Sequence, residues 1–169
     1  MNELARTRHI LKGSRSAQNP ILYASICDSA EVVYLLMLEG HDPSHPNNEP
    51  LNEACRYGYT RVVQLLLLDV RVDPTRNRNE CMRIAISHGA VEVVRVLLID
   101  GRIDPRRDSN FCITEATLAN QHTILEVLIQ DTRVWYTPVD VRLIAQSARN
   151  GDSNAVQILL SLPALVCVW

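Results

Sequence analysis

Apolar positions recur along this chain in the same order five times, at offsets of 30, 31, 31 and 31 residues. One column holds small side chains, a second column three positions earlier holds larger apolar ones, and an apolar pair follows eight positions after the small residue. The small column is Ala24, Ala54, Ala85, Ala116 and Ser147; the larger is Ile21, Leu51, Met82, Ile113 and Ile144; the pairs begin at Val32, Val62, Val93, Ile124 and Ala155. Such a period is typical of stacked supersecondary units that share one continuous core.

Each period predicts a short first helix followed by a tight turn. In the third period Asn79 precedes an apolar-periodic run over 81–88, and Gly89 ends it, as an Asn N-cap and a Gly turn would. The second period repeats this from Asn48 to Gly58. Asp28 and Asn120 replace the turn Gly in the first and fourth periods, and both residue types can adopt the left-handed conformation that the turn requires.

A second helix is predicted after each turn, because apolar residues recur there at helical spacing. The predicted ranges are 31–38, 61–68, 92–99, 123–130 and 154–161. The chain then turns back through Asp-Pro at Asp42-Pro43, Asp73-Pro74 and Asp104-Pro105. Since Pro disfavours helix for the residue before it, these dipeptides predict extended or turn structure between the units.

This arrangement resembles the ankyrin repeat. The family pattern T-P-L-H-x-A-A-x-x-G-H-x-E-V-V-x-L-L-L is matched over residues 49–67 and again over 80–98, with Gly-x-x-Glu-Val-Val intact from Gly89 to Val94. The resemblance implies an all-α, ankyrin-type solenoid of about five helix-turn-helix repeats with short connecting loops. The expected boundaries are an N-terminal lead or partial cap at 1–18 and repeats at 19–48, 49–79, 80–110, 111–141 and 142–169.

The chain departs from the family pattern in three ways. No repeat keeps the Thr or the His of the T-P-L-H tetrapeptide, and the repeats are about two residues shorter than the usual 33. We therefore expect loops shorter than the family's β-hairpin finger. The C-terminal run 162–169 is apolar where a terminal cap is polar, so either it folds back on the last helices or the array continues or docks there.

The composition narrows the function further. Five repeats and a short lead account for nearly all 169 residues, which leaves no room for a separate catalytic domain. A net charge of -2 gives no electrostatic reason to expect nucleic acid or an anionic membrane as partner. The N-terminus has no apolar run of a secretory signal, and no stretch approaches the roughly 18 apolar residues of a membrane span.

The five cysteines show no C-x-x-C spacing. Equivalent positions in stacked helices lie about 8–10 Å apart, beyond the separation of about 4.4–6.8 Å between Cα atoms that a disulfide needs. We therefore expect small, half-buried free thiols in a reducing compartment, which indicates a cytoplasmic protein and leaves the nucleus open.

No constellation of residues predicts catalysis. His41 and His45 have a spacing seen among zinc ligands, but no paired cysteines complete a tetrahedral site. His88 and Cys81 lie two turns apart on one predicted helix, too far to form a nucleophile and its base. We expect no catalytic residue, no metal and no cofactor.

A periodic Asp-x-Arg ladder follows the second helices of three repeats. It comprises Asp69 with Arg71, Asp100 with Arg102, and Asp131 with Arg133. One interpretation is that these pairs neutralise one another within and between repeats, each contributing about 0–1 kcal/mol. The other is an Arg-lined edge for an acidic partner.

The resemblance places the binding face on the first helices and the loops. Carried onto this chain, the helix-end positions before the turn are Arg56, Tyr57, Ser87, His88, Leu118, Arg149 and Asn150. The loop positions are Arg76, Arg78, Arg106, Arg107, Phe111, Trp135 and Tyr136. Tyr, Trp and Arg are common interface anchors.

These residues and the resemblance together predict a non-enzymatic scaffold that binds a partner protein through its concave face. Two alternatives stay open. The chain could be the substrate-recruiting module of a larger adaptor, such as a ubiquitin-ligase component. It could also bind acidic or phosphorylated ligands through arginines, which steep salt dependence would reveal.

Overall fold

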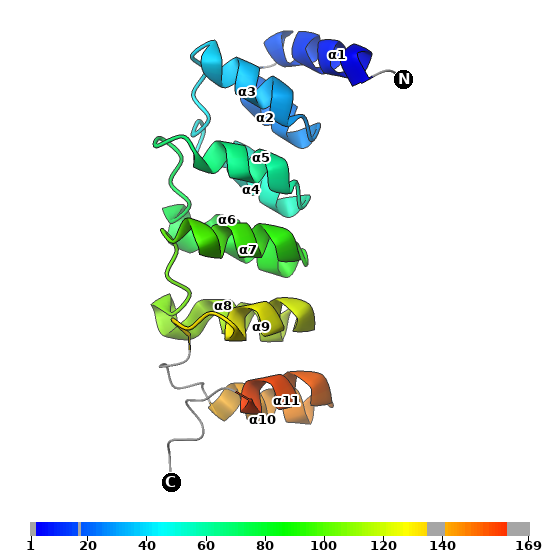
Figure 1. Cartoon of the computed structure of the whole chain (residues 1–169). Helices are drawn as coiled ribbons and strands as arrows, with labels where there is room; N and C mark the ends of the chain where they lie inside the picture. Colours follow the sequence, from blue (N-terminus) through cyan, green and yellow to red (C-terminus); the bar gives the residue numbers. More distant parts are fainter. Residues whose placement is uncertain (1–2, 17, 135–140, 162–169) are drawn as a thin grey trace. The chain divides into compact units, whose positions relative to one another are not determined.

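The computed structural model describes residues 3–16, 18–134 and 141–161, and within these ranges every regular element is a helix. The helices are α1 (Glu3–Ser16), α2 (Pro20–Ile26), α3 (Ala30–Leu38), α4 (Glu49–Arg56), α5 (Thr60–Leu67), α6 (Arg76–Ser87), α7 (Val91–Asp100), α8 (Arg107–Leu118), α9 (His122–Ile129), α10 (Val141–Arg149) and α11 (Ser153–Leu160). The second helix of each repeat thus begins one residue before its predicted range and ends within one residue of it. The all-helical fold that the sequence predicts is confirmed (Figure 1).

The chain divides into two compact units, residues 1–102 and 103–169. In the first unit the helix pairs α2–α3, α4–α5 and α6–α7 stack so that first helices contact first helices and second helices contact second helices. Helix α1 packs on α2 and α3. In the second unit α8 contacts α10, and α9 contacts α11, by the same rule. Below, the first helix of each pair is called inner and the second outer.

The repeating apolar columns form the core of each unit, as the sequence predicts. The four alanines of the small column are fully buried, and Ser147 is nearly so. The larger column is buried from Ile21 to Ile113, but Ile144 is half-buried, and Leu143 takes the more buried place in α10. The last described repeat therefore packs its inner helix less deeply than the others.

The turn between the two helices of a repeat has the backbone conformation that the sequence predicts. Gly58 and Gly89 have φ of 72° and 69°, and Asp28 and Asn120 adopt φ of 52° and 54° at the equivalent positions. A side chain with a β-carbon is disfavoured in this left-handed region, and Asp and Asn tolerate it best. The first and fourth repeats thus keep the turn geometry without glycine.

Replacing Asp28 by Ala should lower the free energy of unfolding by about 1 kcal/mol, because Ala tolerates the left-handed conformation poorly. Asp28 is exposed, so the change removes little packing. Replacing Asp28 by Gly is the matched control and should leave the stability equal or higher. Urea unfolding monitored by circular dichroism measures both, and equal loss in the two variants would contradict the backbone explanation.

The side chains of Asn48 and Asn79, before α4 and in the first turns of α6, make no capping hydrogen bond, which corrects the sequence prediction; Asn19, in contrast, caps α2 by accepting from the backbone N–H of Leu22 at 3.1 Å. Asn48 stands at the N-cap of α4 in a left-handed conformation with no capping hydrogen bond, and its amide donates instead to the carbonyl of Asp73. In α6 the residues 77–79 are all left-handed, so the regular helix begins only after Asn79. The buried amide of Asn48 therefore joins two successive loops rather than capping its own helix.

The loops between repeats are built on the Asp-Pro dipeptides, whose three prolines are buried. The carboxylate of Asp73 accepts hydrogen bonds from the backbone N–H and the hydroxyl of Thr75, at 2.9 and 2.7 Å. Asp42 does the same with Ser44. These are compact side-chain-to-backbone turns, and no β-strand occurs in the loops that the structure describes.

The thiols are more deeply buried than the sequence suggests. Cys55, Cys81 and Cys112 are fully buried rather than half-buried, and Cys27 is half-buried. Burial raises the pKa of the Cys55 thiol, and a hydrogen bond with Cys81 adds to the effect. Among the described residues all four cysteines are free thiols, and the three buried ones fill core space; Cys167 lies outside these residues.

Candidate partner-binding surface

In the first unit, the helix ends that precede the turns form a partly exposed strip. Tyr57 is 53 % exposed and stacks on Tyr59, with ring centroids 5.5 Å apart. The guanidinium of Arg56 lies 3.1 Å from the carboxylate of Glu53, one turn earlier on α4. Both side chains are held by neighbours on their own repeat.

His88 occupies the matching position at the end of α6. Its Nδ1 lies 3.0 Å from the carbonyl oxygen of Ile84 and 3.0 Å from the hydroxyl of Ser87. Because a carbonyl only accepts, Nδ1 carries the proton in this arrangement. The exposed imidazole is thereby fixed against the helix end.

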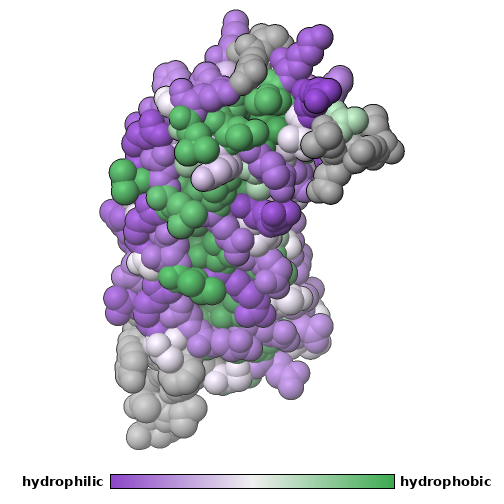
Figure 2. Space-filling view, turned by 45° about the horizontal axis from the view of Figure 1, so that its top comes forward, coloured by the Kyte–Doolittle hydropathy of each residue, from purple (hydrophilic) through white to green (hydrophobic). Residues whose placement is uncertain are grey.

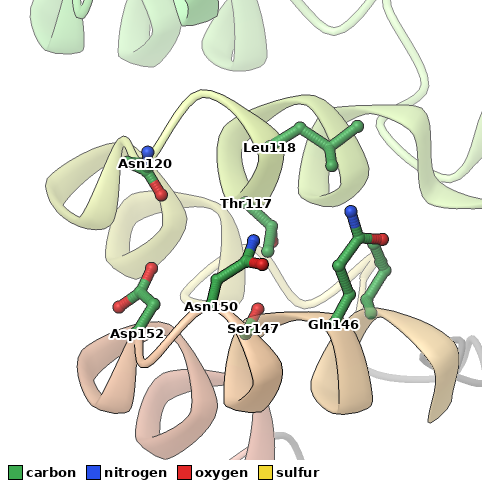
Figure 3. A pocket seen from close by; sticks show the side chains of 8 residues that line it. Thr117, Leu118, Asn120, Gln146, Ser147, Asn150 and Asp152 are labelled. Carbon is green, nitrogen blue, oxygen red and sulfur yellow. The ribbon is translucent and has the colours of Figure 1, made fainter.

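In the second unit, two predicted residues, Leu118 and Asn150, line a small pocket of about 150 Å³ between α8 and α10. Figure 3 shows the amides of Gln146 and Asn150 rising from the α10 repeat toward Thr117 and Leu118 of α8. Leu118 is 54 % exposed. Arg149 is exposed at the end of α10 and does not line the pocket.

The pocket includes polar residues that the sequence analysis did not select. Asp152 caps α11 by accepting from the backbone N–H of Ala155 at 3.0 Å, and its carboxylate lies 2.9 Å from Nε2 of His122. These two contacts, with the capping bond the larger, hold the pKa of Asp152 below its ordinary value. Gln146 directly precedes Ser147 of the small-residue column, near the helix-end positions named from the sequence. The repeat register could therefore have identified Gln146 as a surface residue of the same region.

The residues predicted to lie on exposed loops differ in their exposure and in their place in the structure. Arg76, Arg78 and Arg107 are exposed; Arg76 and Arg78 precede the regular part of α6, which begins after Asn79, and Arg107 is the first residue of α8. Arg106 is exposed and pairs with Asp104 at 3.0 Å. Phe111 lies within α8 and is only 4 % exposed, so its placement on an exposed loop is wrong; it is a core residue. Trp135 and Tyr136 lie outside the described residues.

The Asp-x-Arg ladder joins each repeat to the one before it. Arg102 holds Asp100 with a two-pronged contact at 2.7 and 2.8 Å, and also donates to the carbonyls of Val72 at 2.7 Å and Leu67 at 2.9 Å. Arg133 likewise pairs with Asp131 and reaches a carbonyl thirty residues earlier, that of Ile103. The structure therefore favours the interpretation that these charges bind one another and the adjacent repeat.

The same hydrogen bonds perturb the ladder carboxylates. Arg102 holds the pKa of Asp100 below its ordinary value of 3.8, and Arg71 and Arg133 do so for Asp69 and Asp131. A carboxylate whose pKa is lower in the folded state than in the unfolded state stabilises the fold when the pH is above its unfolded-state pKa. This stabilisation is lost as the pH falls through the folded-state pKa.

We therefore expect the free energy of unfolding to decline as the pH falls below 3.8, the ordinary value for these carboxylates. The triple variant Asp69→Asn, Asp100→Asn, Asp131→Asn should be less stable at neutral pH and should show a shallower decline in acid. Urea titrations across this pH range measure both slopes. An unchanged slope in the triple variant would mean that other carboxylates control the acid response.

A second hollow, in the first unit, was not expected from the sequence. It has a volume of about 440 Å³ and lies along α2 and the start of the next repeat, where Leu22, Tyr23, Ile26 and Pro46 supply apolar contact. Leu38 at the end of α3 and Leu68 just after α5 are also exposed apolar side chains. Figure 2 shows apolar groups set among polar ones on the face that it presents.

The described residues contain no group of three or more His, Cys, Asp or Glu side chains that could hold a metal ion. Within the same ranges no helix has both the length and the apolar character that crossing a bilayer requires.

Stacked helix pairs joined by left-handed turns define a helical repeat protein. The family model for ankyrin repeats, in three copies, matches residues 21–109. The chain therefore belongs to the ankyrin repeat family. Among curated proteins, no sequence matches it.

Proposed function

We propose that this chain is a non-enzymatic scaffold that binds a partner protein through the inner-helix ends. Ankyrin repeats are generally protein–protein interaction modules. The observation that carries the proposal is the exposure of Tyr57, a large aromatic side chain that the core does not bury, between Arg56 and the stacked ring of Tyr59. Aromatic and arginine side chains of this kind are frequent binding hot spots.

The contacts around these side chains favour tight binding. Tyr57 is restrained by its stacking, Arg56 by Glu53, and His88 by the carbonyl of Ile84. Side chains that are already ordered lose less conformational entropy when a partner docks. In the second unit, considered by itself, we assign the same role to the exposed helix ends at Leu118, Arg149 and Asn150.

The triple variant Arg56→Ala, Tyr57→Ala, His88→Ala should weaken the binding of a partner captured by pull-down by about 2 kcal/mol. The reason is that these side chains lie at the ends of two successive inner helices, where a cluster of binding hot spots is proposed. All three side chains are at least partly exposed, so the fold should be retained. Isothermal titration calorimetry of the captured partner measures the change.

The matched control is the outer-helix triple Arg61→Ala, Gln64→Ala, Arg95→Ala, whose members are all exposed. It should alter the affinity by less than about 0.5 kcal/mol. If the control abolishes binding while the inner triple leaves it intact, the partner uses the outer helices and the proposed surface is wrong. A steep loss of affinity with salt would instead favour an acidic ligand.

A further inference from the structure

The small pocket between α8 and α10 presents polar side chains that are not bonded to one another. Asn120, Gln146 and Asn150 contribute amides, and Ser147 contributes a hydroxyl. Among the described residues, none of these four side chains makes a hydrogen bond to another group of the protein. Ser147 is only 3 % exposed, and Figure 3 shows its hydroxyl pointing from α10 into the pocket. These groups are therefore available to a ligand.

The fold does not require this polar lining. Ser147 is the one polar member of the small column, whose other four members are alanines. Two repeats earlier, the positions equivalent to Gln146, Ser147 and Asp152 are occupied by Ile84, Ala85 and Ala90. A shielded hydroxyl without a hydrogen-bond partner costs stability, so packing alone does not account for Ser147. A ligand that bonds to it would.

The carboxylate of Asp152 determines the charge of that ligand. It is the only ionisable group among the residues that line the pocket, and its side chain is 14 % exposed. Hydrogen bonds with the backbone N–H of Ala155 and with His122 hold its pKa below its ordinary value, so it is charged at neutral pH. A shielded carboxylate repels an anion and attracts a cation. The amides beside it can offer their oxygens to the same cation.

The size and the apolar part of the pocket narrow the ligand further. Its volume of about 150 Å³ is below the roughly 300–1,000 Å³ of sites for cofactors and other small molecules, and suits a single side chain. Figure 3 shows Leu118 on one side of the pocket and Asp152 on the other. This arrangement fits a side chain with an aliphatic stem and a charged head.

We propose that this pocket binds an arginine side chain of the partner protein. A guanidinium carries five N–H donors in one plane, so it can bond to a carboxylate and to several amide oxygens at once, whereas an ammonium has three donors. The aliphatic stem then contacts Leu118. The inference rests on the proposed function in that the arginine belongs to a partner protein, and it adds that this partner presents a basic residue to the second unit.

The test is a titration of the full chain with N-acetyl-arginine amide, followed through the side-chain amide signals of Gln146 and Asn150 in heteronuclear NMR spectra. We expect saturable shifts of these signals with a Kd on the order of 1 mM, which is typical of a ligand of this size. N-acetyl-citrulline amide has nearly the same shape without the charge and should bind about tenfold more weakly. N-acetyl-lysine amide should also bind more weakly than the arginine compound.

The variant Asp152→Asn should weaken the binding of N-acetyl-arginine amide by about tenfold or more, because it removes the charge. Asn caps a helix as well as Asp does, so α11 should be retained. The matched control is Asp104→Asn, which removes the same charge from a half-exposed carboxylate of the same unit and should leave the Kd unchanged. Should Asp152→Asn unfold the last repeat, Gln146→Ala removes an exposed amide of the pocket and should weaken the binding instead.

Ser147→Ala separates a binding role from a structural one. It should weaken the binding by about threefold while the free energy of unfolding stays equal or rises, because an unpaired hydroxyl is removed. Lower stability with an unchanged Kd would overturn the proposal. So would equal binding of the citrulline compound, tighter binding of the lysine compound, wild-type affinity in Asp152→Asn, or no saturable shift at tens of millimolar. No partner enters this titration, so its failure leaves the strip around Tyr57 to be judged by the pull-down.

Discussion

Replacing Leu66 by Ala is expected to lower the free energy of unfolding by about 3–5 kcal/mol. Leu66 lies on α5 with no exposed surface, and α5 contacts both α3 and α7. The substitution leaves a cavity in a layer where each helix pair depends on its neighbours for its core. Urea unfolding followed by circular dichroism at 222 nm, the standard helix signal, measures the loss.

Leu68→Ala is the matched control, since Leu68 follows two residues later and is 80 % exposed. Its effect should stay within about 0.5 kcal/mol. Comparable losses in the two variants would show that α5 does not pack as described. A normal loss for Leu66→Ala with an altered m-value would instead indicate that the repeats no longer unfold together.

Replacing Arg102 by Ala should cost about 3 kcal/mol of stability, because one side chain makes two hydrogen bonds to carbonyls of the preceding repeat and also holds Asp100. Hydrogen bonds that involve a charged group contribute about 1.5–3 kcal/mol each, and partial exposure of the guanidinium reduces the sum. Arg102→Lys should recover little, since an ammonium cannot reproduce the planar fork.

Arg106→Ala separates this linking role from simple charge pairing. The guanidinium of Arg106 pairs with the nearby Asp104 at 3.0 Å, and both side chains are about half exposed. Its loss should cost less than about 1 kcal/mol. If Arg106→Ala proves as damaging as Arg102→Ala, contact with the preceding repeat is not what makes the ladder arginines stabilising.

The sequence predicted the repeated helices well because their signals are local and redundant. The alanine column, the apolar pairs and the turn residues all point to the same helix pair, and Asp28 and Asn120 adopt the expected left-handed turn. What the sequence missed depends on partners distant along the chain. The amide of Asn48 reaches Asp73 in the next repeat rather than its own helix, and nothing in the local pattern distinguishes the two.

The candidate surface was predicted less well, for a related reason. Helix-end positions follow directly from the register, so Tyr57 and Leu118 are exposed as expected. Phe111 was assigned to a loop because the pattern did not show that the inner helix of its repeat begins earlier, at Arg107, and that its ring turns inward. Exposure near a helix start depends on backbone conformation, such as that of Asn110, which is left-handed and directly precedes Phe111.

The buried thiols allow local unfolding of individual repeats to be measured by their reaction with an alkylating reagent. Only a thiolate reacts with an alkylating reagent, and burial suppresses that form at Cys55. Cys55, Cys81 and Cys112 lie in three different helix pairs, and each is shielded until its own pair opens. The order in which a maleimide labels these three positions, read by mass spectrometry, would therefore map how readily each repeat opens without any engineered probe.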